Sequence, residues 1–110
     1  MVTQTNNLKK TIKKFLVKLE EKGIQVHRIY LYGSYVNGRP SRFSDIDLAV
    51  ISTSFNKKNI VKRQELLGEI IYSIGEPIEA IGYSLQEFQK VPAFSFLSSI
   101  ISHGQIVHRG

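Results

Sequence analysis

Two aspartates interrupt a stretch of the chain that otherwise has the pattern of a buried strand. In residues 44–52, SDIDLAVIS, apolar side chains such as Leu48 point to one face of a strand, whereas Asp45 and Asp47 point to the other. The two carboxylates leave that face about 6.6 Å apart along the strand. Placing a carboxylate on an apolar strand costs free energy unless a positive group compensates its charge. The fold must therefore expose this face to solvent or supply a cation to it.

A magnesium ion is the cation that suits this pair best. Two like charges at this spacing raise each other's pKa unless a cation lies between them. Mg²⁺ is a hard ion that one or two carboxylates hold, with water sites left free for substrate phosphates. Two such ions about 4 Å apart would activate an attacking oxygen and neutralise a leaving pyrophosphate. A solvent-facing strand edge explains the pair equally well, so the aspartates alone leave both interpretations open.

The Gly33-Ser34 pair lies where an earlier predicted strand turns into a short helix. Glycine permits a positive φ there and lets the backbone approach a ligand closely. The N–H groups of a helix N-terminus, with the Ser34 hydroxyl, form a ready anion site. A serine that only caps the helix gives the same pattern. Gly38 lets the chain fold back, so we expect this turn and the acidic pair to lie on neighbouring strands.

Hydrophobic periodicity predicts the other elements of a single domain that spans residues 1–110. Their order is helix, strand, strand, helix, strand, helix, which predicts an α/β (α+β) sandwich with one small mixed sheet flanked by helices. The predicted elements are helices over about 6–22 and 55–75, strands over 26–33, 44–52 and 76–84, two short helices hinged before Pro92, and a small strand over 105–109.

The composition limits the classes of protein to which the chain can belong. A hydrophobic share of 42% supports a modest core. The chain has no cysteine, no apolar stretch of the roughly 18 residues that span a bilayer and no signal-peptide core near its start, so we expect a cytoplasmic protein without a membrane partner. The formal charge of +6 favours anionic partners. Nucleic acid is only weakly indicated, because aromatic residues are not interleaved with the lysines of the first helix.

Basic and aromatic residues outside these motifs are expected to have minor or structural roles. Two arginines lie in the loop between the half-motifs, and four basic residues at the start of the second long helix add weak positive potential near a substrate. The C-terminal aromatic residues are most simply part of the core, with a partner surface as the alternative. These sets are Arg39 and Arg42; Lys57, Lys58, Lys62 and Arg63; and Phe88, Phe94 and Phe96.

Residues 33–48, GSYVNGRPSRFSDIDL, resemble the signature of the minimal nucleotidyltransferase family, within the DNA polymerase β-like superfamily. The signature is Gly-Ser, ten residues, then Asp-x-Asp, and Gly38 and Ser44 also match it. The chain length and the order of elements resemble the whole catalytic core of the family. The resemblance implies an Mg²⁺-dependent enzyme that transfers a nucleoside monophosphate, with ATP as the favoured donor, to an acceptor hydroxyl and releases pyrophosphate.

The same resemblance implies a role for each residue of the site. Asp45 and Asp47 would hold Mg²⁺, and Gly33, Ser34 and Ser44 would bind the nucleotide. The family usually has a third carboxylate on the next strand, which binds metal and serves as base toward the acceptor. The matching residue is Glu79, where aspartate is more common, and its longer side chain changes the reach toward the metal. An exposed polar residue on a strand is the alternative for Glu79.

The resemblance also implies a partner that supplies the acceptor. Small members similar to this chain often act as antitoxins beside a HEPN-type RNase toxin and transfer AMP to a tyrosine of that toxin. A catalytically weak or inactive nucleotide-binding module that acts by contact alone is an alternative, favoured by the Glu79 departure. A modifier of aminoglycoside-type small molecules is a third, although such proteins usually carry an added helical domain. The sequence leaves the acceptor, the nucleotide preference and the oligomeric state open.

Overall fold

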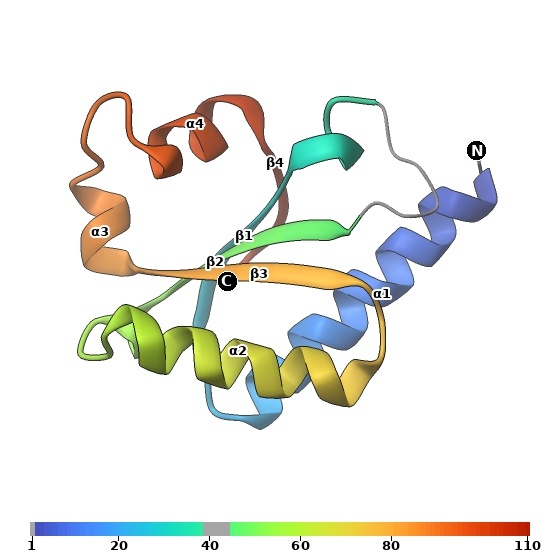
Figure 1. The fold of residues 1–110 in the computed structure, drawn as a ribbon, viewed down its shortest axis with the longest axis horizontal. Coiled ribbons are helices and arrows are strands. Elements are labelled where there is room, and N and C mark those ends of the chain that lie inside the picture. Colours follow the sequence, from blue (N-terminus) through green and yellow to red (C-terminus); the bar gives the residue numbers. More distant parts are fainter. Residues whose placement is uncertain (1, 39–44) are drawn as a thin grey trace.

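One four-stranded mixed sheet organises the protein, with helices on both of its faces (Figure 1). The computed structural model describes the backbone of residues 2–38 and 45–110 and the side chains of residues 7–38 and 45–110. The strand order is β3-β2-β1-β4; β1 runs antiparallel to both neighbours, and β2 and β3 are parallel. The elements are α1 (Val2–Glu21), β1 (Val26–Tyr32), the 3-10 turn η1 (Gly33–Tyr35), β2 (Ile46–Ser52), the 3-10 turn η2 (Thr53–Phe55), α2 (Ile60–Ile74), β3 (Ile78–Ser84), α3 (Leu85–Gln89), α4 (Phe96–His103) and β4 (Gln105–Arg109).

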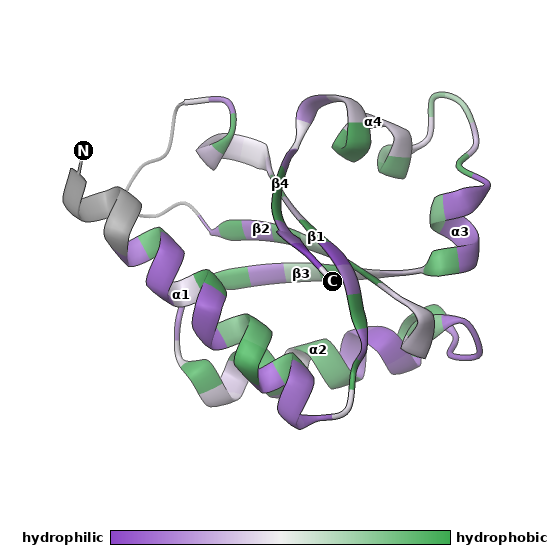
Figure 2. Ribbon diagram, turned by 180° about the vertical axis from the view of Figure 1, so that it is seen from behind, coloured by the Kyte–Doolittle hydropathy of each residue, from purple (hydrophilic) through white to green (hydrophobic). Residues whose placement is uncertain are grey.

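The two faces of the sheet bury different sets of side chains. On one face Leu48 of β2 packs in a core cluster with residues of α1 and α2, among them Leu67. On the other face Ala49 belongs to a smaller cluster with Leu97 of α4. In Figure 2 hydrophilic and hydrophobic residues alternate around α1, as expected of a helix with one buried stripe. Because side chains alternate along β2, Asp47 lies on the same face as Ala49, which is the face covered by α4.

The predicted fold class and order of elements are confirmed, with shifted boundaries. The helix expected over 55–75 begins only at Ile60, because the side chain of Asn59 accepts a hydrogen bond from the Lys62 backbone N–H at 2.9 Å and caps α2. Gly75, with a left-handed φ of 75°, ends it. Ile60, the first residue of α2, is 67% exposed. Within the described residues no helix combines the length and apolar character needed to cross a bilayer.

Two of the three aromatic residues expected in the core lie on the surface instead. Phe94 is fully exposed and has a left-handed φ of 63°, and Phe96 is 57% exposed. Phe88 is half-buried, with its ring edge-on to that of His27. The chain turns at Phe94 so that the Ser95 side chain can accept a hydrogen bond from the Ser98 N–H at 3.1 Å and cap α4. The alternative interpretation of these aromatics, a partner surface, therefore stays open for two of them.

Arg63 is buried rather than solvated at the start of α2. Its Nε donates a hydrogen bond to the Lys58 carbonyl at 2.8 Å, and its Nη1 donates to Glu87 Oε1 at 2.6 Å and to the Gly82 carbonyl at 3.3 Å. Glu87 also closes a capping box with Ser84 at the start of α3. Burial by itself would raise the pKa of Glu87, but the hydrogen bonds from Ser84 and Arg63 lower it overall. This network fixes α2, the end of β3 and α3 to one another.

Replacing Arg63 by Met tests this network, because the variant keeps the apolar stem and removes every donor. Breaking a buried pair typically costs about 3–5 kcal/mol; because Glu87 is partly exposed, we expect the free energy of unfolding at pH 7 to fall by about 2 kcal/mol in urea titrations. Since the Glu87 pKa is lowered in the folded state, the difference from wild type should shrink as the pH falls below the ordinary value of 4.5.

The matched control for this prediction is Lys62→Met, which removes a neighbouring charge from an exposed position of the same helix turn. Its effect should stay below about 0.5 kcal/mol. Equal losses in the two variants would show that the buried contacts of Arg63 add nothing to stability.

Candidate active site

The register of the sheet brings acidic side chains from two strands together. In the parallel pair β2 and β3, Asp47 lies opposite Glu79, and in the antiparallel pair β1 and β2, Tyr32 lies opposite Asp47. Directly paired residues project to the same face, so these three side chains form a row across the sheet on the α4 face. Asp45 lies two residues before Asp47 and is exposed just ahead of β2. The structure thus gathers three of the predicted site residues at one end of the sheet.

The chain leaves β1 at Gly33, directly against the carboxylate of Asp47. Gly33 has a φ of 79°, which L-residues with a side chain rarely adopt. A Cβ added at Gly33 would overlap Oδ2 of Asp47. The glycine predicted for close approach to a ligand therefore already makes a close approach to a site carboxylate.

The predicted helix after the Gly-Ser pair is a single 3-10 turn. In η1 the N–H groups of Val36 and Asn37 both donate to the Gly33 carbonyl at 3.1 Å. A three-residue turn has too few peptide groups to build the macrodipole of a longer helix. A phosphate at this turn would therefore depend on local N–H groups and on the half-buried Ser34. The predicted residue Ser44 lies outside the described residues, as do Arg39 and Arg42.

The carboxylates share a strongly negative environment. Burial, followed by the charge of Glu79, a hydrogen bond with Glu79 and the charge of Asp45, raises the pKa of Asp47 to about 6. Burial and then the charges of Asp47, Tyr83 and Glu79 raise the pKa of Tyr32 to about 12. Across the described residues, the ion pairs of the protein lie elsewhere and none includes a carboxylate of this site. The site therefore favours a positively charged ligand.

The donor set fits a hard divalent cation. Carboxylate oxygens are the ligands that Mg²⁺ prefers, and one or two of them suffice because the ion keeps waters and substrate phosphates as its other ligands. Burial is the largest cause of the raised Asp47 pKa, and a cation near Asp47 and Glu79 would offset the charge repulsion that adds to it. Over residues 7–38 and 45–110, no three His, Cys, Asp or Glu side chains are already arranged around a metal position. Asp45 and Glu79 are exposed, so their part in a metal site stays a prediction.

An aromatic wall that was not predicted from the sequence stands beside these carboxylates. The ring of Tyr32 meets that of Phe96 edge-on, with centroids 5.6 Å apart and planes at 85°. Tyr83 follows Glu79 by four residues on β3 and so faces the same side. Strand alternation could have predicted the position of Tyr83, whereas the position of Phe96 depends on how α4 packs.

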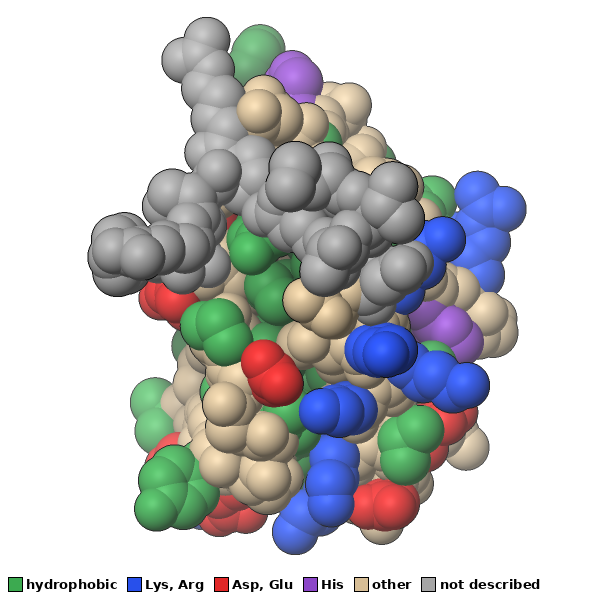
Figure 3. All heavy atoms as spheres, turned by 90° about the vertical axis from the view of Figure 1, so that its right-hand side faces the viewer, with side chains coloured by type: hydrophobic (Ala, Val, Ile, Leu, Met, Phe, Trp, Pro, Cys, Tyr) green, Lys and Arg blue, Asp and Glu red, His purple; other side chains and the backbone are tan. Residues whose placement is uncertain are grey.

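The surface near this end of the sheet also carries positive charge. Seen from the end where β2 and β3 begin, Lys and Arg side chains gather on the α1 side (Figure 3).

Substituting Asp47 by Asn should stabilise the protein in the absence of metal. The folded-state pKa of Asp47 is raised from 3.8 to about 6, so the folded state binds more protons than the unfolded state between these values and stability falls as the pH rises through them. Solvent screens this partly exposed group. We expect a gain of about 1 kcal/mol at pH 7.5, or about 4–8 °C in the melting temperature of a domain this size.

Thermal melts in the presence of EDTA measure this effect. The advantage of Asp47→Asn over wild type should vanish below pH 4, and the more exposed Asp45→Asn should show a smaller gain. An advantage that does not change with pH would show that the gain does not come from the charge of Asp47.

The contact between Gly33 and Asp47 can be measured by a pair of alanine variants. Gly23 has a φ of 78°, nearly equal to that of Gly33, but nothing lies within 4 Å of a Cβ added there. Gly23→Ala should cost about 1 kcal/mol from backbone strain alone. Gly33→Ala should cost about 1–2 kcal/mol more by urea titration, because its Cβ meets a carboxylate.

A double variant supplies the check on this interpretation. When Asp47 is replaced by Ala, the obstructing carboxyl group is gone, so the extra cost of Gly33→Ala should disappear. If the extra cost persists, it comes from the backbone and not from the contact with Asp47.

Comparison with known proteins places this arrangement in a family. The sequence model described as "Nucleotidyltransferase domain" matches residues 9–107, which is most of the chain. No match was found among curated proteins.

Solved structures share the fold at low sequence identity. A protein from Sulfolobus solfataricus assigned as a nucleotidyltransferase is 15% identical, with a TM-score of 0.72 over 98% of this chain and 86% of that one. A toxin–antitoxin complex with AMP-PNP is 20% identical, with a TM-score of 0.64 over 89% of this chain and 73% of that one. A mutant of the toxin–antitoxin pair MntA–HpeT is 19% identical, with a TM-score of 0.60 over 89% and 72%. These likenesses show the fold, and the register that pairs Asp47 with Glu79 agrees with it. Because the family model matches most of the chain, the chain belongs to the nucleotidyltransferase domain family.

Proposed function

We propose that this nucleotidyltransferase uses Mg²⁺ and transfers AMP from ATP to a tyrosine hydroxyl of a HEPN-type partner protein, in the role of an antitoxin. The observation that carries the proposal is the pairing of Asp47 with Glu79 on one face, against the backbone of Gly33. The likeness to toxin–antitoxin complexes, one of them with AMP-PNP, supports the partner and the nucleotide.

Each residue of the site has a distinct task in this reaction. Asp45 and Asp47 would hold the metal, and the Gly33-Ser34 turn would bind the triphosphate. Bound Mg²⁺ would supply the positive charge that neutralises the phosphates. Glu79 accepts the proton of the acceptor hydroxyl. The acceptor oxygen forms a bond to the α-phosphorus, the bond from that phosphorus to pyrophosphate breaks, and pyrophosphate leaves with the electron pair.

A second candidate function is a nucleotide-binding module that inhibits its partner by contact alone. The exposed position of Glu79, in place of the aspartate more common in the family, favours this alternative. Both functions use the same fold and the same partner surface, so variants of the carboxylates are needed to separate them.

Label transfer decides between the two functions. Purified protein, Mg²⁺ and ATP labelled at the α-phosphate are incubated with a lysate of the source cells, beside the Asp45→Asn/Asp47→Asn double variant. We expect a labelled protein band that is at least 100-fold weaker with the variant, because the variant lacks the two carboxylates that would hold the metal. No band with wild type, while MgATP still binds, would favour the contact-only module.

Glu79→Gln separates a role in catalysis from a role in nucleotide binding. Loss of a general base typically costs 10²–10⁴ in rate, so kcat should fall by about that factor. The KM for ATP should change less than about threefold, since this side chain acts on the acceptor. Equal losses in kcat and in ATP affinity would instead make Glu79 a ligand that nucleotide binding requires.

A further inference from the structure

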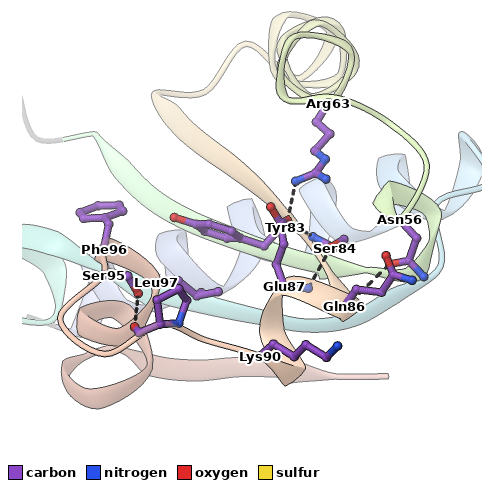
Figure 4. A pocket seen from close by; sticks show the side chains of 11 residues that line it. Asn56, Arg63, Tyr83, Ser84, Gln86, Glu87, Lys90, Ser95, Phe96 and Leu97 are labelled. Atoms are coloured by element: carbon purple, nitrogen blue, oxygen red, sulfur yellow. Dashed lines mark hydrogen bonds and ion pairs between the residues drawn. The ribbon is translucent and has the colours of Figure 1, made fainter.

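Two cavities lie on the α4 face of the sheet, and Phe96 lines both of them. The smaller, of about 320 Å³, borders Gly33, Asn37 and His103. The larger, of about 620 Å³, is bounded by residues of β3, α3 and the loop before α4 (Figure 4). The aromatic pair of Tyr32 and Phe96 therefore stands between a cavity on the Gly33 side and a cavity on the β3 side.

The larger cavity opens on the face of β3 that carries Glu79, the residue assigned to the acceptor. Glu79 and Tyr83 lie on the same face of β3, about 13 Å apart along the strand, and Tyr83 lines the cavity. Figure 4 shows the side chain of Tyr83 extending toward Phe96, away from Asn56 and Gln86 at the opposite end. A chain that lies in this cavity and continues along this face of β3 would reach the carboxylates from the Glu79 side.

Building on the proposed function, we propose that the larger cavity seats the acceptor polypeptide, an acidic segment that presents its tyrosine hydroxyl to Asp47 and Glu79. The donor nucleotide takes the Gly33 side, which leaves the β3 side for the second substrate. A volume of about 620 Å³ exceeds that of one tyrosine side chain and accommodates the residues on either side of it.

The rim of this cavity has the features of a protein interface. Phe94 is fully exposed at a left-handed φ, and the loop that carries it is closed by hydrogen bonds from the Ser95 Oγ and N–H to the Pro92 carbonyl at 2.8 and 3.3 Å. Strained conformations of bulky residues concentrate at functional sites. Aromatic side chains are enriched in the cores of protein interfaces. Phe96, which is 57% exposed, lines the cavity, and the fully exposed Phe94 directly precedes the lining residue Ser95.

The charges around the cavity favour an acidic segment. Lys90 lines the cavity and is exposed, and the exposed Lys57 and Lys58 directly follow Asn56, another lining residue. Glu87, the acidic residue of the lining, is already paired with Arg63 at 2.6 Å. The remaining positive charge attracts carboxylates that flank the acceptor tyrosine.

The test uses a glutamate–tyrosine copolymer as the probe, both as acceptor and as ligand. Phe94→Ala and Lys90→Glu should each raise its KM at least fivefold and leave the KM for ATP within twofold. The matched controls are Tyr72→Ala, which removes an aromatic side chain that is 90% exposed on α2, and Lys13→Glu, which makes the same charge change on α1. Neither control should change the KM for the copolymer more than twofold.

Direct binding keeps this test independent of the proposed function. Fluorescence anisotropy of labelled copolymer should show a Kd that Phe94→Ala and Lys90→Glu weaken at least fivefold, even if no AMP is transferred to any acceptor. Equal weakening by Lys13→Glu, or no binding by wild type, would overturn the proposal. A rise in the KM for ATP without a change for the copolymer would also overturn it, and would assign the cavity to the nucleoside.

Discussion

Repulsion between two carboxylates that the sheet holds side by side is the constraint on which the site depends. Asp47 and Glu79 face each other because β2 and β3 pair in parallel, and a parallel pair needs a crossover, here supplied by α2. The residues that follow Asp47 along β2 are fully buried on both faces of the sheet, among them Leu48 and Ala49. Packing of the strand thus supplies the free energy that keeps the two charges together.

The two faces of the sheet have different roles: one provides most of the buried core, and the other carries the functional groups. The face with α1 and α2 contains most of the large apolar core, including Phe15 and Leu67. The opposite face has a smaller core under α4, and the carboxylates, the phenol rings and two cavities lie there. A protein of 110 residues can expose functional groups on one face because the other face provides most of the burial.

The helices and strands, and the faces to which their residues point, could be predicted from the sequence because local periodicity determines them. The alternation along β2 assigned Leu48 and Ala49 to opposite faces, as the structure has them, and the Gly-Ser and Asp-x-Asp spacing indicated the family that the comparison confirms. The burial of Arg63 could not be predicted, since it depends on Glu87, 24 residues later, meeting it across the end of β3. The exposure of Phe94 likewise depends on the cap of α4. The roles of the site residues and of the metal stay predictions.

The contact between Gly33 and Asp47 changes how this sequence signature should be understood. The glycine is usually explained by the phosphate that its backbone would approach, yet here the space it leaves is filled by a carboxylate of the protein's own neighbouring strand. A descendant of this chain that lost nucleotide binding but kept Asp47 would still need glycine at this position. In such a descendant the first half of the motif would outlive the activity, and its presence would report the shape of the sheet edge rather than catalysis.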